Sequence, residues 1–323
     1  MRYLLASAFI VFIIAFEPAS SAQSLSSPKP EATGSAALPA RHVIGLENVN
    51  SQTSGKISGH NGVMEFDGGK KTIKVPAAEI DDIFIGSEAT QSGGKVGRAV
   101  KTVAIAAPFE SGKVLSLLMY TKVDIFAVSY HEEGGARHCA IFAVPKGQAA
   151  ELKSQLVAGG AHASDAPPAV VTAQPAAPAK AAKKPKPPKL SASAIQIEQI
   201  EAGDAAIPPE FRYAIYERLI EKVRKDGEFQ KVFRSGDREA ANAPDLVILR
   251  TTVSRFKQGN ELQRELTTVT GGTTVDVTTT VAGRDGHIML DSDVSGKVRF
   301  FGENLGATND LAKRIAKILH ESF

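Results

Sequence analysis

Three residues in one short stretch of the chain carry side chains that bind transition metals: His131, His138 and Cys139. Imidazole nitrogen and thiolate sulfur are the ligands that zinc prefers in proteins. A zinc-protease helix would need a histidine where Gly135 stands. His131 and His138 could face each other across a hairpin, and with Cys139 could bind a soft ion. Strand alternation opposes this, because His138 and Cys139 then point to opposite faces. The alternative is a polar hairpin tip with Cys139 buried as a small apolar side chain.

Two other groups of residues resemble parts of catalytic sites. Glu79, Asp81 and Asp82 could supply carboxylates for acid chemistry or calcium, but a solvated strand end explains them as well. Residues 93–95 read Gly-Gly-Lys but lack the remaining positions of a phosphate-binding loop. No Gly-x-Ser-x-Gly nucleophile elbow occurs. We therefore predict a protein that is not an enzyme and has no cofactor. A metal-dependent or hydrolytic enzyme with its site in the N-terminal domain is the alternative.

The N-terminus has the three parts of an export signal. Arg2 precedes an apolar run of 14 residues, 3–16, which is short compared with the roughly 20 residues of a spanning helix. Ser20 and Ala22 place small side chains at positions −3 and −1 of a cut before Gln23. We predict a signal peptide over residues 1–22 and a periplasmic or secreted product. The only cysteine excludes an intramolecular disulfide.

Residues 159–192 are predicted to form a flexible linker rich in proline, alanine and lysine. The net charge of the whole chain is +3, and five lysines here carry most of it, so the rest is close to neutral and does not resemble a nucleic-acid binder. The linker lysines could contact an anionic lipid surface, or they could only make the spacer soluble. These possible anionic-surface contacts are Lys180, Lys183, Lys184, Lys186 and Lys189.

Residues 41–158 read as an antiparallel β-rich domain with a closing helix, following a disordered segment over residues 23–40. Asn61-Gly62 between alternating runs is a strong hairpin signal. Further strands are expected near residues 72–75, 80–85, 112–120, 123–130 and 137–144, and a helix over 146–157. Six or seven strands with one closing helix resemble a bacterial pleckstrin-homology-like domain. That resemblance implies a binding or scaffold role.

Residues 193–323 predict a second, α+β domain, with two helices on an antiparallel sheet. Phe211, Ile215, Leu219 and Val223 recur every four residues after Pro208-Pro209, which indicates an amphipathic helix. Strands are expected over residues 194–200, 229–233, 246–256, 267–281 and 287–300, with a C-terminal helix near 311–319. The whole protein is thus predicted to be α+β.

The second domain resembles an uncharacterised family of bacterial envelope lipoproteins, related in architecture to the N-terminal domain of the Tol–Pal periplasmic protein. The resemblance lies in the first helix, in residues 243–247 and 271–272, in the Arg284-Asp285-Gly286 turn and in the final helix. Members of that family usually carry an acylated cysteine, which this chain lacks. The resemblance implies the cell envelope as the compartment.

Taken together, these features predict a non-enzymatic binding or assembly protein of the cell envelope. Its partner would be an envelope protein or a lipid, with peripheral membrane contact possible and no nucleic acid. A lipid-associated structural surface protein is the further alternative. The threonine-rich strand at residues 273–281 could be an ordinary half-buried strand or a sheet edge that accepts a partner strand.

Overall fold

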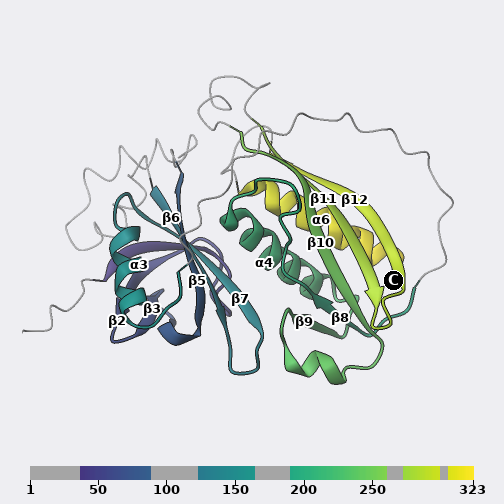
Figure 1. The fold of residues 1–323 in the computed structure, drawn as a ribbon, viewed down its shortest axis with the longest axis horizontal. Helices are drawn as coiled ribbons and strands as arrows, with labels where there is room; N and C mark the ends of the chain where they lie inside the picture. The colour runs from purple at the N-terminus through teal and green to yellow at the C-terminus, as the bar shows by residue number, and fades with distance from the viewer. Residues whose placement is uncertain (1–36, 89–122, 164–189, 260–271, 299–304) are drawn as a thin grey trace, which may run out of the picture. The chain divides into compact units, whose positions relative to one another are not determined.

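The structure is a computed structural model, which describes residues 37–88, 123–163, 190–259, 272–298 and 305–323. Among these residues the chain forms a seven-stranded sheet, a five-stranded sheet and three α-helices (Figure 1). The protein is therefore α+β, as the sequence predicted, with a β-rich N-terminal part and a helix at its C-terminus.

The first sheet is antiparallel throughout, in the order β4-β3-β2-β1-β7-β6-β5. The predicted closing helix is confirmed as α3, which packs against β2 with Leu152 and Leu156 fully buried. The elements are β1 (Leu38–Ile44), β2 (Thr53–His60), β3 (Val63–Asp67), β4 (Thr72–Pro76), β5 (Ile80–Glu88), β6 (Val123–His131), β7 (Arg137–Pro145) and α3 (Ala149–Ala158).

The hairpin predicted at Asn61-Gly62 is confirmed. Both residues have positive φ, 51° and 72°, which is the backbone of a type I′ turn. The turn sets the register in which His60 pairs with Val63 and Ile57 with Phe66. Alternation along these strands then places Ile57 and Phe66 in the core, where both are almost fully buried.

The second sheet has the order β12-β11-β10-β8-β9 and is mixed, whereas the sequence interpretation gave an antiparallel sheet. Strand β8 is parallel to both of its neighbours. Helix α4 carries the chain from the end of β8 back to the start of β9, and the segment after β9 carries it back to the start of β10. The turn predicted at Arg284-Asp285-Gly286 joins β11 to β12. The strands are β8 (Ala194–Ile197), β9 (Lys231–Arg234), β10 (Leu246–Lys257), β11 (Thr273–Gly283) and β12 (Ile288–Val298).

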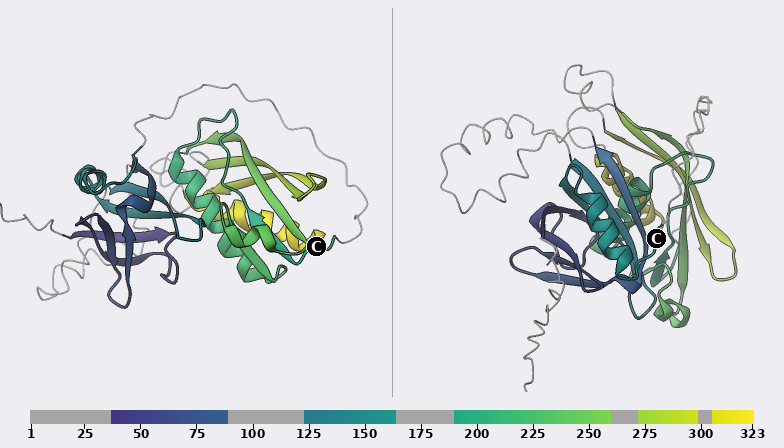
Figure 2. Two further views of the ribbon diagram at one scale, coloured as in Figure 1. Left: turned by 60° about the horizontal axis from the view of Figure 1, so that its bottom comes forward. Right: turned by 60° about the vertical axis from the view of Figure 1, so that its left-hand side comes forward.

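Two helices pack on the second sheet, α4 (Pro209–Asp226) and α6 (Gly306–Ser322). They lie side by side, and α6 covers the face of β11 and β12, as the views in Figures 1 and 2 agree. Helix α4 also contacts strands β1, β5, β6 and β7 of the first sheet. One apolar cluster accordingly contains Val43, Ile141 and Cys139 together with residues of α4, α6 and the second sheet.

The structure corrects two further details of the sequence interpretation. Strand β1 begins at Leu38, so residues 38–40, predicted to be disordered, pair with β2. The threonine-rich strand is β11, which lies between β10 and β12 and is therefore not a sheet edge. Its alternation is as predicted, with Val275, Val277 and Val281 buried. The strand expected near residues 112–120 and the Gly-Gly-Lys at 93–95 lie outside the described residues.

Candidate functional site

A buried ion pair joins helix α4 to strand β9. The Arg234 guanidinium donates two hydrogen bonds to the Glu217 carboxylate, from Nη1 to Oε1 at 2.8 Å and from Nη2 to Oε2 at 3.0 Å. Glu217 Oε1 also accepts a hydrogen bond of 2.8 Å from the backbone N–H of Cys139 in β7. Glu217 is 4 % exposed and Arg234 5 %. One carboxylate thus holds a strand of each sheet.

The electrostatics of this pair follow from its burial. Burial raises the pKa of Glu217, and the Arg234 guanidinium acts in the opposite direction. Burial alone would lower the pKa of Arg234, but the Glu217 carboxylate more than offsets it and raises that pKa, so the guanidinium stays protonated. A buried ion pair of this kind is costly to break, because either partner left alone is an uncompensated charge in the interior.

Backbone and hydroxyl groups extend the contact between β7 and β9. The carbonyl oxygen of Arg137 accepts hydrogen bonds from Tyr216 Oη and Arg234 Nη1, both at 3.2 Å. The Arg137 N–H donates to the Ser235 carbonyl oxygen at 3.0 Å, and the Ser235 N–H donates to Tyr216 Oη at 2.9 Å. These bonds satisfy polar groups that the junction of the two sheets would otherwise bury unpaired.

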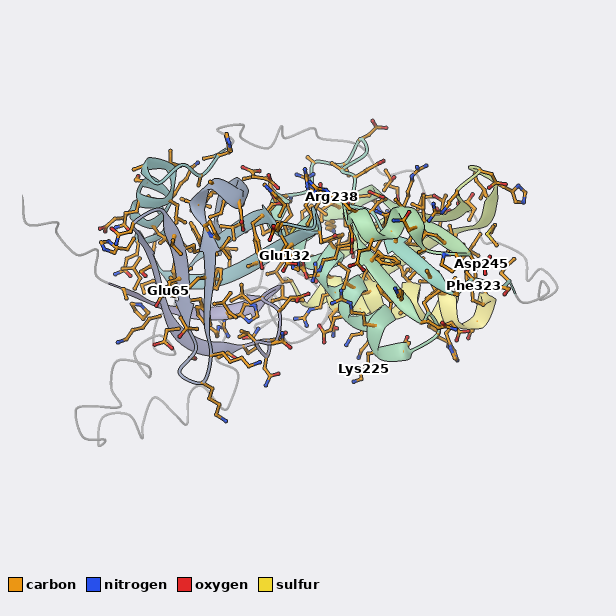
Figure 3. All side chains as sticks on the ribbon, turned by 90° about the horizontal axis from the view of Figure 1, so that it is seen from below. Glu65, Glu132, Lys225, Arg238, Asp245 and Phe323 are labelled. Carbon is orange, nitrogen blue, oxygen red and sulfur yellow. The ribbon has the colours of Figure 1, made fainter. Side chains whose placement is uncertain are left out.

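Next to the ion pair lies a cavity of about 720 Å³. One wall is the segment 44–51, which leaves β1, and the other is the C-terminal half of α4. The cavity has the size of a small-molecule site. The side chain of Lys225, labelled in Figure 3, extends from the end of α4 at its rim. The charged residues that line the cavity are Glu47, Glu217, Glu221, Arg224, Lys225 and Arg234.

The three candidate metal ligands do not converge on one point. In the β6–β7 register His131 is opposite Arg137 and His138 is opposite Tyr130, so the two histidines do not face each other, contrary to the possibility raised from the sequence. The His131 ring lies 3.0 Å from Asp81 Oδ1. Within the described residues no group of three or more histidine, cysteine, aspartate or glutamate side chains is arranged to hold a metal.

His138 and Cys139 are both buried, on opposite faces of β7, as strand alternation requires. The His138 ring stacks on Tyr130 at 5.2 Å between centroids, and burial, with Arg234 and Arg224 nearby, lowers its pKa to about 3. Its Nε2 comes within 3.1 Å of Glu132 Oε1, but without the geometry of a hydrogen bond. Burial raises the pKa of the Cys139 thiol, which is therefore a poor nucleophile.

The remaining candidates from the sequence lie apart from the cavity or outside the described residues. Asp81 contacts His131, and Asp82 Oδ2 accepts a hydrogen bond of 3.3 Å from Tyr213 Oη. These carboxylates are thus engaged in contacts between elements. The linker lysines Lys180, Lys183, Lys184, Lys186 and Lys189 all lie outside the described residues.

Glu210, in the first turn of α4, is a buried carboxyl group that makes the stability of the fold depend on pH. It is 9 % exposed, its Oε2 has no hydrogen-bond partner among the described residues, and burial raises its pKa to about 7. The folded state therefore binds this proton more tightly than the unfolded chain, whose carboxyl has the ordinary pKa of 4.5. The resulting stabilisation is complete below about pH 4.5 and is lost as the pH rises through about 7.

We expect Glu210→Gln to raise the free energy of unfolding at pH 8 by about 3 kcal/mol, because the amide stays neutral where the carboxylate is buried and charged. Urea unfolding between pH 5 and pH 8 measures this, and the stability of the natural chain should fall more steeply with pH than that of the variant. Glu221→Gln, an exposed change on the same helix, is the control. Equal slopes for Glu210→Gln and the natural chain would contradict the assignment.

Sequence reasoning did not identify Glu217, Arg234 or the cavity. Glu217 lies between Ile215 and Leu219, away from the four-residue stripe, and so has the pattern of a solvated helix position. One signal was present: Ala214 and Ile220 widen the apolar face beyond a single stripe. In the structure this wider face, with Tyr216 and Glu217, is buried.

No protein-family model and no curated protein sequence matches the chain. Several solved structures resemble part of this chain. A PelC dodecamer subunit from Paraburkholderia phytofirmans has 12% identity and a TM-score of 0.31, over 40% of this chain and 89% of that one. A candidate neuraminyllactose-binding hemagglutinin homologue from Helicobacter pylori has 11% identity and a TM-score of 0.23, over 42% and 89%. A candidate lipoprotein from Caulobacter crescentus has 16% identity and a TM-score of 0.20, over 39% and 81%.

With TM-scores below 0.5, these likenesses carry no argument about what this chain does. Within the part of the chain that the structure describes, no helix combines the length and apolar character needed to cross a membrane.

Proposed function

We propose that the protein is an exported, non-enzymatic binding protein of the cell envelope, and that its ligand site is the cavity between segment 44–51 and α4. The observation that carries the proposal is the cavity itself, which is large enough for a small ligand and has charged side chains of both signs in its walls. The apolar leader over residues 3–16 supports the location outside the cytoplasm.

The chemistry of the lining favours binding over catalysis. Glu217 and Arg234 are committed to each other by two hydrogen bonds, and Arg224 contacts Glu47. Such paired charges can recognise the polar groups of a ligand and orient it. The cavity wall combines residues of both halves of the chain, so a bound ligand would contact both.

Site-specific photo-crosslinking in cells that make the protein tests the proposal. A benzophenone amino acid replaces Ser51, an exposed residue of the cavity wall, and, as the control, the exposed Lys313 on α6. A discrete adduct of defined mass at position 51, in the envelope fraction and absent at position 313, is the expected result. The same adducts at both positions, or none at position 51, would overturn the assignment of the cavity.

A further inference from the structure

Glu47 lies between two guanidinium groups in the cavity wall. Its Oε1 is 3.5 Å from Arg224 Nη1 and 3.8 Å from Arg234 Nε. Arg224 comes from α4, Arg234 from β9 and Glu47 from the segment that follows β1. Charge-assisted hydrogen bonds between guanidinium and carboxylate groups are about 2.7–2.9 Å long. Glu47 therefore occupies the space between the two arginines loosely, at distances longer than the optimum.

Arg234 retains an unused donor at this point. Its two Nη atoms donate hydrogen bonds to the Glu217 carboxylate, and Nη1 also donates one to the Arg137 carbonyl oxygen. Its Nε is buried and has no hydrogen-bond partner among the described residues, although the side chain lines the cavity. A buried N–H without an acceptor is unfavourable, so a group that accepts this hydrogen bond gains affinity.

The charge balance of the cavity depends on where the Glu47 carboxylate lies. Among the described residues that line the cavity, three carboxylates face three cations when the Glu47 carboxylate is in place. The Glu47 side chain is 43% exposed and can turn toward solvent. Two carboxylates, Glu217 and Glu221, then face the three cations Arg224, Lys225 and Arg234, which leaves room for one negative charge.

We propose that the space between Arg224 and Arg234 is a subsite for the carboxylate group of a small organic acid or of a peptide C-terminus, and that Glu47 is its internal placeholder. This inference rests on the proposed function, because it assigns part of the same cavity. The incoming carboxylate displaces the Glu47 side chain. It accepts a hydrogen bond from Arg234 Nε–H and forms an ion pair with Arg224. The group that Glu47 presents to the arginines is itself a carboxylate, which favours this anion over phosphate.

Calorimetric titration of the full chain with N-acetyl-L-alanine tests the subsite, with N-acetyl-L-alaninamide as the ligand that lacks the charge. We expect Glu47→Gln to bind the acid about tenfold more tightly than the natural chain, and Arg224→Gln about tenfold more weakly. Neither variant should bind the amide. Glu65→Gln and Arg314→Gln, which change the same residue types away from the cavity, should leave the affinity for the acid unchanged.

The Nε–H resonance of Arg234 gives a second readout that a general change in stability would not move. It should shift on addition of the acid and stay in place on addition of the amide. Succinate in a parallel titration distinguishes the sources: tighter binding of succinate than of N-acetyl-L-alanine indicates a free organic acid, and the reverse indicates a peptide terminus.

An affinity for the acid that Glu47→Gln leaves unchanged would overturn the subsite. So would inorganic phosphate binding as tightly as the acid at equal ionic strength, since the carboxylate preference would then be lost. The two proposals fail separately. If the amide, added before irradiation, prevents formation of the adduct at position 51 as well as the acid does, the carboxylate subsite is wrong and the cavity assignment stands. If no adduct forms at position 51 in the absence of competitor, the cavity assignment itself is wrong.

Discussion

Replacing Arg234 with methionine is expected to lower the free energy of unfolding by about 3–5 kcal/mol, because it leaves the Glu217 carboxylate buried without its counter-charge. Among the described residues, only the Cys139 N–H would still donate to that carboxylate. The Arg137 carbonyl oxygen would also lose the hydrogen bond from Arg234 Nη1. Equilibrium unfolding in urea, followed by circular dichroism, measures the change.

The double variant Glu217→Met/Arg234→Met separates the cost of an unpaired charge from the loss of packing. Removing both partners of a buried ion pair is usually far less harmful than removing one. We therefore expect the double variant to be more stable than Arg234→Met alone. If the single change cost less than about 1 kcal/mol, the pair would not hold the two sheets as the structure indicates.

Gly45→Ala is expected to destabilise the fold by about 3 kcal/mol or more and to disrupt the cavity wall. Gly45 has φ +105°, a backbone conformation that L side chains rarely adopt. A Cβ at this position would also collide with the carbonyl oxygen of Cys139 in the neighbouring strand β7. Because segment 44–51 forms one wall of the cavity, the variant should also lose the adduct at position 51.

Gly160→Ala is the matched control for this change. Gly160 has nearly the same φ, +104°, but nothing lies within 4 Å of the Cβ that alanine would add. This variant carries only the conformational cost, which is about 1–3 kcal/mol. Thermal and urea unfolding of the two variants side by side should show a larger loss for Gly45→Ala. Equal losses would mean that the contact with β7 does not constrain segment 44–51.

The features that the sequence predicted are those encoded over a few neighbouring residues. The Asn61-Gly62 turn follows from two residues that tolerate positive φ. Helix α4 follows from apolar residues at every fourth position after Pro208-Pro209, and it begins at Pro209. Alternation along residues 273–281 identified the buried face of β11.

The features that sequence reasoning missed depend on pairs of residues far apart in the chain. Glu217 and Cys139 are 78 positions apart, and Glu47 and Arg224 are 177 apart. No local periodicity links such positions, so Glu217 had the pattern of an exposed helix residue. The order of the strands also depends on residues far apart in the chain. Strand β8 pairs with β10 although α4 and β9 lie between them in the sequence, and no local sequence pattern specifies this pairing.

The prediction of a domain over residues 41–158, a linker over 159–192 and a domain over 193–323 stays a prediction. The structure adds contacts that this division did not foresee. His162 donates a backbone hydrogen bond to Ile80, Leu190 donates one to Ser322, and Ala161 lies in the core of the first sheet. The described ends of the predicted linker are therefore packed against folded elements.

The proposed ligand site requires that the two sheets are joined across α4, and the reactivity of Cys139 tests this directly. Cys139 is the only cysteine of the chain, is 1% exposed, and packs in the cluster that contains residues of both sheets. Labelling of the native protein with a thiol reagent should be at least about a thousandfold slower than in the urea-unfolded chain, and faster in Arg234→Met. Labelling of the native chain at the rate of the unfolded one would contradict the joined arrangement and the cavity that depends on it.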